Sequence, residues 1–167
     1  PWGAQLTLGG NAQATTLAAT LQVPAAAGRS PQQAELKAEL QLLQAWPLRS
    51  LALSTRDLDL SALHAQAPRT RLGGEATLRM SARDAPASAR IALDNAAPGP
   101  WQQQRVPVAK LTADLSGNLA QPDRLELVRA ELLLADGRRS AGRVQLQALW
   151  QGTQLALQGR LDQGAPG

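Results

Sequence analysis

Several residue types are missing from this 167-residue chain, and each absence removes a class of function. There is no cysteine, which excludes thiol catalysis, iron–sulfur clusters and cysteine-based zinc sites. With one histidine, any metal site would have to be built almost wholly from carboxylates. Phenylalanine and tyrosine are absent, and the 2% of aromatic residues are all tryptophan. Modules that stack nucleic-acid bases on rows of aromatic side chains are therefore not expected.

Long apolar runs are missing as well. The longest, residues 132–135, is far shorter than the roughly 18 residues that a membrane-spanning helix needs. No charged-then-apolar signal stretch opens the chain, which begins at Pro1 and ends at Gly167. The length fits one domain. We interpret residues 1–167 as a single soluble segment of a longer protein.

The chain is basic, but its positive charge is dispersed. Seventeen Lys and Arg residues against 13 Asp and Glu residues give a net charge of +4 and a pI near 10.9. Scattered arginines are typical of a solvated polar face, and they would also give a weak preference for anionic partners such as lipid headgroups or acidic proteins. No nucleic-acid partner is expected, because the basic residues do not cluster on one element.

What the sequence has in abundance is alternation of apolar and polar residues. A period of two places the apolar side chains on one face of a β-strand and the polar ones on the other. The pattern is clear in residues 17–23, 34–42, 76–82, 89–93, 111–115, 144–148 and 155–157. The alternation predicts an all-β protein.

Residues that favour turns separate these stretches. They are Gly9–Asn11, Gly73–Gly74, Gly117–Asn118, Asp136–Gly137 and Gln151–Thr153. The spacing predicts about ten strands, which would form an antiparallel sheet roughly 48 Å wide with strands up to about 30 Å long. A doubly wound sheet is not expected, because strands and helices do not alternate.

Two segments leave the type of element open. Residues 35–44 are rich in helix formers, and Leu36, Leu40 and Leu43 also fit helical spacing. The strict alternation of their polar neighbours favours a strand. In the second segment, Asp59 or Ser61 could cap a short helix near residues 60–66.

The apolar side of the predicted strands is almost purely aliphatic. Such a face is usually buried against a second sheet in a closed sandwich, which normally recruits aromatic residues. The alternative is a curled sheet whose concave apolar groove holds a ligand, since an uncovered apolar face is otherwise a liability. Composition alone does not decide between the two. The residues predicted to line the face are Leu36, Leu40, Leu78, Met80, Ile91, Leu93, Leu111, Leu115, Val144, Leu146, Leu155 and Leu157.

No constellation of residues points to catalysis. Asp57 and Asp59 would share one face of a strand, as in paired-carboxylate or calcium sites, but a solvated stretch or a helix cap fits better because no third ligand is in view. His64 has no serine and aspartate partners in a nucleophile motif, and the Gly-Gly pairs form no phosphate-binding loop. We therefore expect no enzyme activity, no cofactor and no metal.

Two pairs of segments resemble the TamB family of AsmA-like, bridge-like lipid-transfer proteins. The first pair is residues 58–63 (LDLSAL) followed by 67–74 (APRTRLGG). The second pair is residues 95–101 (NAAPGPW) followed by 105–108 (RVPV). The resemblance extends over roughly residues 30–165, an internal segment of a much longer protein of the translocation and assembly module.

This resemblance implies a long, taco-shaped β-sheet with a hydrophobic groove and no catalytic residues. Proteins of this family are anchored in the inner membrane of Gram-negative bacteria, extend into the periplasm, and carry phospholipid to the outer membrane. They also work with an Omp85-type outer-membrane barrel, a TamA-like partner, in assembling outer-membrane proteins. The alternative function is that of a β-rich chaperone or binding module that templates strands of outer-membrane client proteins.

Overall fold

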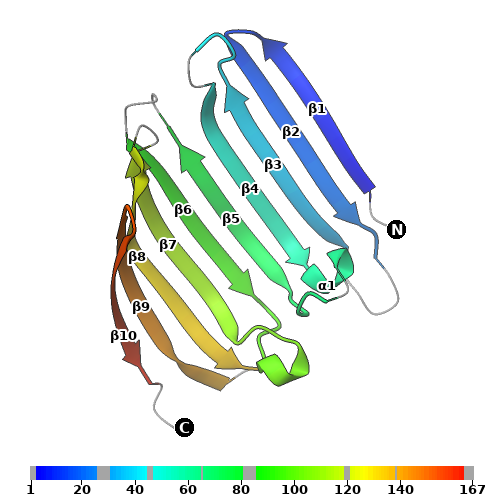
Figure 1. Ribbon diagram of the computed structural model, residues 1–167. Helices are drawn as coiled ribbons and strands as arrows, with labels where there is room; N and C mark the ends of the chain where they lie inside the picture. The colour runs from blue at the N-terminus through cyan, green and yellow to red at the C-terminus, as the bar shows by residue number, and fades with distance from the viewer. Residues whose placement is uncertain are drawn as a thin grey trace.

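The computed structural model describes residues 3–25, 31–44, 47–64, 66–80, 86–118, 121–137 and 139–163. They form one open antiparallel sheet of ten strands, in which every strand pairs with its neighbours in the sequence (Figure 1). The all-β prediction is confirmed. The strands are β1 (Gly3–Asn11), β2 (Ala14–Val23), β3 (Gln32–Leu40), β4 (Leu48–Leu58), β5 (Leu72–Arg79), β6 (Pro86–Asn95), β7 (Val108–Asn118), β8 (Gln121–Asp136), β9 (Arg139–Gln151) and β10 (Gln154–Asp162).

Local sequence explains most of the strand boundaries. At the β1–β2 turn, the side-chain oxygen of Asn11 accepts hydrogen bonds from the backbone N–H groups of Gln13 and Ala14. The turns after β8 and β9 contain Gly137 and Gly152, both with positive φ. Residues 32–40 form a strand and not a helix, as their alternating polar residues favour.

One predicted turn is wrong. Gly73 and Gly74 lie inside β5 and do not separate two strands. Gly74 has a φ of 131°, and a Cβ atom there would lie 2.1 Å from the carbonyl oxygen of Ala92. The glycine therefore permits a close approach of backbones within the sheet, next to an irregularity in the β4–β5 register.

Two short helices occupy the same end of the sheet. The helix α1 (Leu60–Leu63) connects β4 to β5, and the 3₁₀ helix η1 (Trp101–Gln103) precedes β7 (Figure 1). Asp59 caps α1 through a hydrogen bond from the backbone N–H of Ser61, as one of the two predicted caps would. The helix ends at Leu63, before the predicted end at residue 66.

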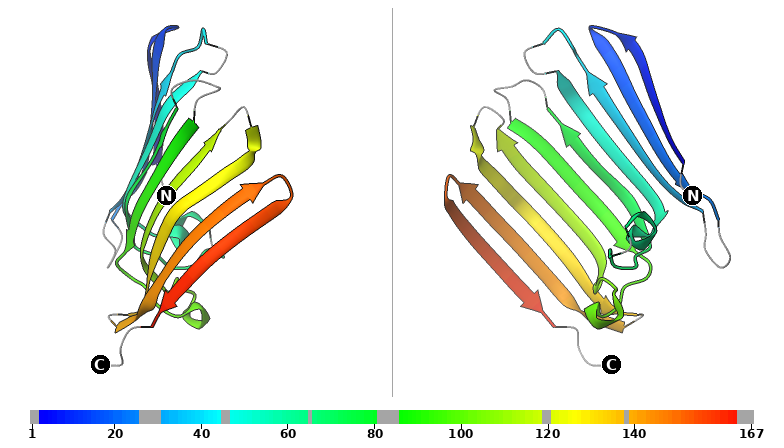
Figure 2. Two further views of the ribbon diagram at one scale, coloured as in Figure 1. Left: turned by 90° about the vertical axis from the view of Figure 1, so that its left-hand side faces the viewer. Right: turned by 45° about the vertical axis from the view of Figure 1, so that its right-hand side comes forward.

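The sheet is curled as well as twisted. In Figure 2, β9 and β10 swing out of the plane of β1–β5 toward the side on which α1 and η1 lie. The backbone N–H of Asp59, just before α1, donates to the side chain of Gln32, which shares its face with Ala34 and Leu36. The sheet therefore curls toward the face that carries these apolar residues.

Candidate functional site: the apolar face

The register of the ten strands aligns apolar residues in continuous rows across the whole sheet. Directly paired residues point to the same face, so a row can be followed from one edge strand to the other. The central row is Leu6, Ala19, Leu36, Leu53, Ala76, Ile91, Ala113, Ala130, Leu146 and Gly159. It contains no polar side chain.

A row on each side of the central row repeats the pattern. Toward the turn that joins β1 to β2, the row is Leu8, Leu17, Ala38, Leu51, Leu78, Ala89, Leu115, Leu127, Ala148 and Leu157. Toward α1, it is Ala4, Leu21, Ala34, Thr55, Gly74, Leu93, Leu111, Leu132, Val144 and Leu161. We call the side of the sheet that carries these three rows the apolar face.

Of the twelve predicted lining residues, the strand register places eleven on the apolar face, and Met80 directly follows β5. Ten of them are buried or half-buried by their neighbours, Met80 being the most enclosed with 6% exposure. The other two, Leu155 and Leu157, lie in the edge strand β10 and are more than 60% exposed. The strands thus present these residues on one side of the sheet, and their role in lining a lipid groove stays a prediction.

The prediction missed part of the face. Leu6 and Leu8 in β1 and Leu51 and Leu53 in β4 complete the rows at the N-terminal half of the sheet. Their alternation is visible in the sequence, but it is short and lies next to stretches of Thr, Ser and Gly. Trp150 also lies on this face, opposite Leu125, and is 54% exposed.

No second layer covers the apolar face in the described part of the chain. Among these residues no large side chain is fully buried, and most of the buried apolar residues are alanines. The folded chain exposes 11598 Å². A closed monomer of this mass would expose about 7,900 Å². The sheet is therefore a single layer, and a shallow hollow of about 350 Å³ lies over Leu6, Leu21 and Leu36.

The apolar face contains one orphaned polar atom among the described residues. The hydroxyl oxygen of Thr55 is buried and has no hydrogen-bond partner. Its row neighbour Gly74 has no side chain, so the row has a notch at this point. Among the described residues of the three rows, Thr55 is the only one with a polar side chain, so the rows offer almost no side-chain hydrogen bonds that would hold a ligand at one place.

The opposite, outer face is polar. Its cross-strand pairs include Arg90 with Asp114, whose Nε and Oδ1 atoms are 2.9 Å apart. The hydrogen bond to Asp114 and the charge of that carboxylate raise the pKa of Arg90 above its ordinary value. These pairs are exposed, so each adds little to stability. They keep this face in contact with water.

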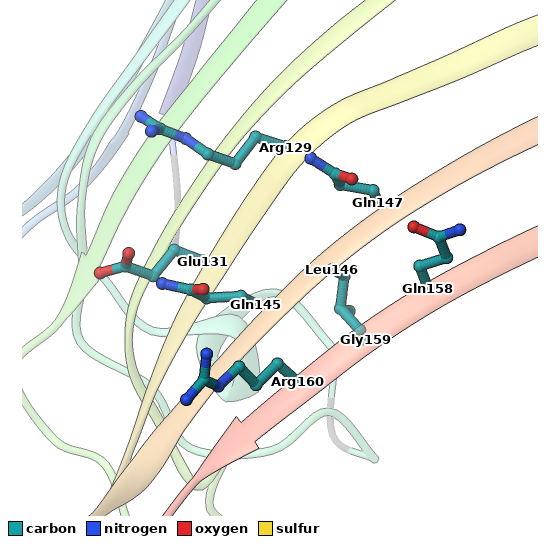
Figure 3. Close-up of a pocket in the computed structure, with 8 residues that line it drawn as sticks. All are labelled: Arg129, Glu131, Gln145, Leu146, Gln147, Gln158, Gly159 and Arg160. Atoms are coloured by element: carbon teal, nitrogen blue, oxygen red, sulfur yellow. The ribbon is translucent and has the colours of Figure 1, made fainter.

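Figure 3 shows a hollow on the outer face over β8–β10. It has a volume of about 430 Å³ and is bordered by polar side chains, among them Arg129, Gln147 and Gln158. A bulge in β8, where the register shifts between Leu127 and Ala130, accompanies it. Its border also includes Leu146 and Gly159 of the central row.

A group of buried polar residues closes the end of the apolar face next to α1. We call residues 57–71 and 95–107 the cap. The hydroxyl of Thr70 donates to the carbonyl of Leu58 and accepts from the N–H of Leu60. The side chain of Asn95 accepts from the N–H of Arg71 and donates to the carbonyl of Val108. These bonds fix the loops at one rim of the groove.

The cap also explains the two aspartates. Asp57 forms an ion pair with Arg71, in which Nε and Oδ1 are 2.6 Å apart. Asp59 accepts from Ser61 and from the N–H of Thr70. They are therefore structural groups with separate partners, and His64 is exposed at the end of α1.

Within the described ranges, no group of three or more His, Cys, Asp and Glu residues could hold a metal ion. The described helices are all too short and too polar to cross a membrane.

Comparisons with family models, with curated proteins and with solved structures find no match for this chain. Fold and face thus define it as an all-β protein with an open, one-sided apolar sheet.

Proposed function

We propose that the apolar face binds the acyl chains of phospholipids and lets them move across the strands. In this proposal the chain is a segment of a periplasmic, bridge-like protein of the TamB type, anchored in the inner membrane. It carries phospholipid to the outer membrane and contributes, with an Omp85-type barrel, to outer-membrane protein assembly. The observation that supports the proposal best is the set of three rows, almost entirely aliphatic, that cross all ten strands without a covering layer in the described part of the chain.

An apolar surface lowers the free-energy cost of moving a phospholipid through water. Each CH₂ group exposed to water costs about 0.8 kcal/mol, so the two tails of a phospholipid meet a barrier of tens of kcal/mol in an aqueous compartment. An aliphatic groove lowers that barrier. Because the three rows present almost no hydrogen-bonding groups, they give hydrocarbon no fixed position, and the tails can slide.

The composition of the face favours hydrocarbon over a protein partner as its occupant. The cores of protein interfaces are enriched in aromatic residues, Met and Arg. Among the residues that the register places on the apolar face, Trp150 is the one aromatic residue, and the one methionine of the chain, Met80, directly follows β5. Its leucines and alanines instead resemble the chemistry of the acyl chain.

The first test compares two leucines of β9. Leu146 lies in the central row of the apolar face, whereas Leu149 pairs with Glu126 and points to the outer face. We expect Leu146→Glu to reduce co-purifying phospholipid at least about tenfold, because a charge placed against hydrocarbon is strongly disfavoured. Leu149→Glu should retain it. Solvent extraction of the purified chain followed by lipid mass spectrometry measures both.

In the full-length protein, Leu146→Glu should also stop lipid transfer while expression is unchanged. If both variants carry as much lipid as the unaltered chain, or if the unaltered chain carries none, the acyl chains are not the occupant.

The edge strands favour the alternative, a module that adds client strands. β1 is exposed along its whole length and carries no charged residue or proline, the devices that usually protect an edge. A client strand could pair with it antiparallel to β1. In a hairpin with a two-residue turn the hydrogen-bonded pairs alternate starting from Asn11 and Ala14, so the N–H groups of the even-numbered residues of β1 point to the open edge. We expect Ala4→Pro, which removes one of these donors and keeps an apolar residue on the face, to weaken binding of an alternating β-strand peptide and to leave bound lipid unchanged. Fluorescence anisotropy of the labelled peptide measures the binding. Equal binding by the variant and by the unaltered chain would exclude β1 as the place where a client strand is added.

A further inference from the structure

Two arginines lie side by side in the cap. Arg69 and Arg105 are partners in an isolated parallel bridge between the two cap loops. The backbone N–H of Arg69 donates to the carbonyl of Gln104 over 2.7 Å. Partners in a bridge are about 5 Å apart at their Cα atoms and point their side chains the same way, so like charges placed opposite each other repel.

The backbone around this pair is held firmly. Gln104 has a φ of 54°, one of two positive values among the described residues that are not glycine. The stem of Arg105 lies against Gly99, where a Cβ atom would be 2.6 Å from its Cδ atom. The N–H of Gly99 donates to the carbonyl of Val106 over 3.1 Å. Strained backbone that the surroundings hold in place is concentrated at functional sites.

Neither guanidinium group has an ion pair or a hydrogen bond in the described part of the chain. The two carboxylates of the cap are already engaged, Asp57 with Arg71 and Asp59 with Ser61 and Thr70. Arginine keeps its charge at any physiological pH. Two uncompensated arginines at paired backbone positions make a site that is complementary to an anionic oxygen group, phosphate above all.

We propose that Arg69 and Arg105 bind the phosphate group of a phospholipid headgroup. The proposal rests on the proposed function for the source of the phosphate. A lipid whose tails lie on the apolar face has its headgroup at a rim, and the cap forms one rim, joined to the face through Gln32 and Asn95. The arginine pair thereby orients the lipid in the groove.

The test uses soluble probes and the full chain. Dihexanoyl phosphatidylglycerol, dihexanoylglycerol and inorganic phosphate are titrated by calorimetry, with the lipids kept below their micelle concentrations. The variants are R69Q/R105Q, the charge-preserving R69K/R105K, and R79Q as a control. Arg79 is also exposed and without a side-chain partner in the described residues, but it lies at the opposite end of β5.

We expect the unaltered chain to bind the phosphate-bearing lipid about tenfold more tightly than dihexanoylglycerol, the gain of one charge-assisted contact. R69Q/R105Q should remove this difference without weakening dihexanoylglycerol binding. R69K/R105K should keep part of it because it keeps the charge, and R79Q should keep all of it. Circular dichroism checks that each variant is folded.

The other results are equally informative. If inorganic phosphate binds with the same dependence on the two arginines while neither lipid binds, the anion site stands, its ligand is free phosphate, and the proposed lipid function fails. If R69Q/R105Q binds all three probes as the unaltered chain does, the arginine pair is not an anion site. That outcome leaves lipid binding to the apolar face intact.

Discussion

Leucines next to alanines pack the apolar face without aromatic rings. In the central row, Ala113 and Ala130 are directly paired, and they are 7% and 4% exposed. Ala113 lies between Leu111 and Leu115 along β7, and both leucines are half-buried. The rows therefore bury aliphatic area within a single layer, in which no large side chain of the described residues is fully buried.

The two adjacent glycines of β5 allow a matched test of this packing. Gly74→Ala should lower the free energy of unfolding by about 2–4 kcal/mol, because the residue keeps a positive φ and its new Cβ meets backbone atoms of β6. At Gly73, a Cβ would meet its nearest neighbour, the carbonyl oxygen of Thr55, at 3.8 Å. Gly73→Ala should therefore change stability by less than about 1 kcal/mol. Urea denaturation measures both, and equal losses would contradict the assignment of strain to Gly74.

At the scale of elements, periodicity predicted the strands and the face, but not the irregularities. Strand β3 was predicted because its polar residues alternate, although its leucines also fit a helix. In β8, the bulge near Val128 and Arg129 shifts the alternation by one residue, so that Leu127 and Leu132 share a face. A bulge depends on pairing with two neighbouring strands, and the sequence of one strand does not contain that information. The glycines Gly73 and Gly74 were predicted to form a turn for the same reason, because their place inside β5 depends on pairing with the neighbouring strands.

The hydroxyl of Thr70 contributes to the stability of the cap, and Thr55 on the apolar face is a matched control. Thr70, two residues before β5, joins the end of β4 to the start of α1 through its hydroxyl group. Thr70→Val should cost about 1–3 kcal/mol, because it leaves the N–H of Leu60 without that partner. Thr55→Val should be neutral or stabilising, because the hydroxyl of Thr55 has no partner to lose. Thermal denaturation followed by circular dichroism distinguishes the two, and a larger loss at Thr55 would contradict this account.

For the whole molecule, the sequence left open whether the aliphatic face is covered. That question concerns what lies above the strands, and the same alternation serves a closed sandwich and an open groove equally well. The structure answers it through the total exposed area, 11598 Å² against the roughly 7,900 Å² of a closed monomer. Because no second layer covers the described residues, the apolar face is available to a lipid and the edge strands are available to another strand.

The uncovered face predicts a low urea m-value, the slope of the unfolding free energy against urea concentration. The unfolded chain would expose about 25,500 Å², so folding removes roughly four fifths of the area that a closed domain of this mass would bury. Because the urea m-value is proportional to that area, we expect it to be about one fifth below the value for closed domains of 167 residues. The measurement needs the monomer, confirmed by sedimentation at the same concentration, because edge pairing between copies would cover surface. An m-value equal to that of a closed domain in the monomer would mean that the face is covered in solution, and the groove would then have no room for lipid.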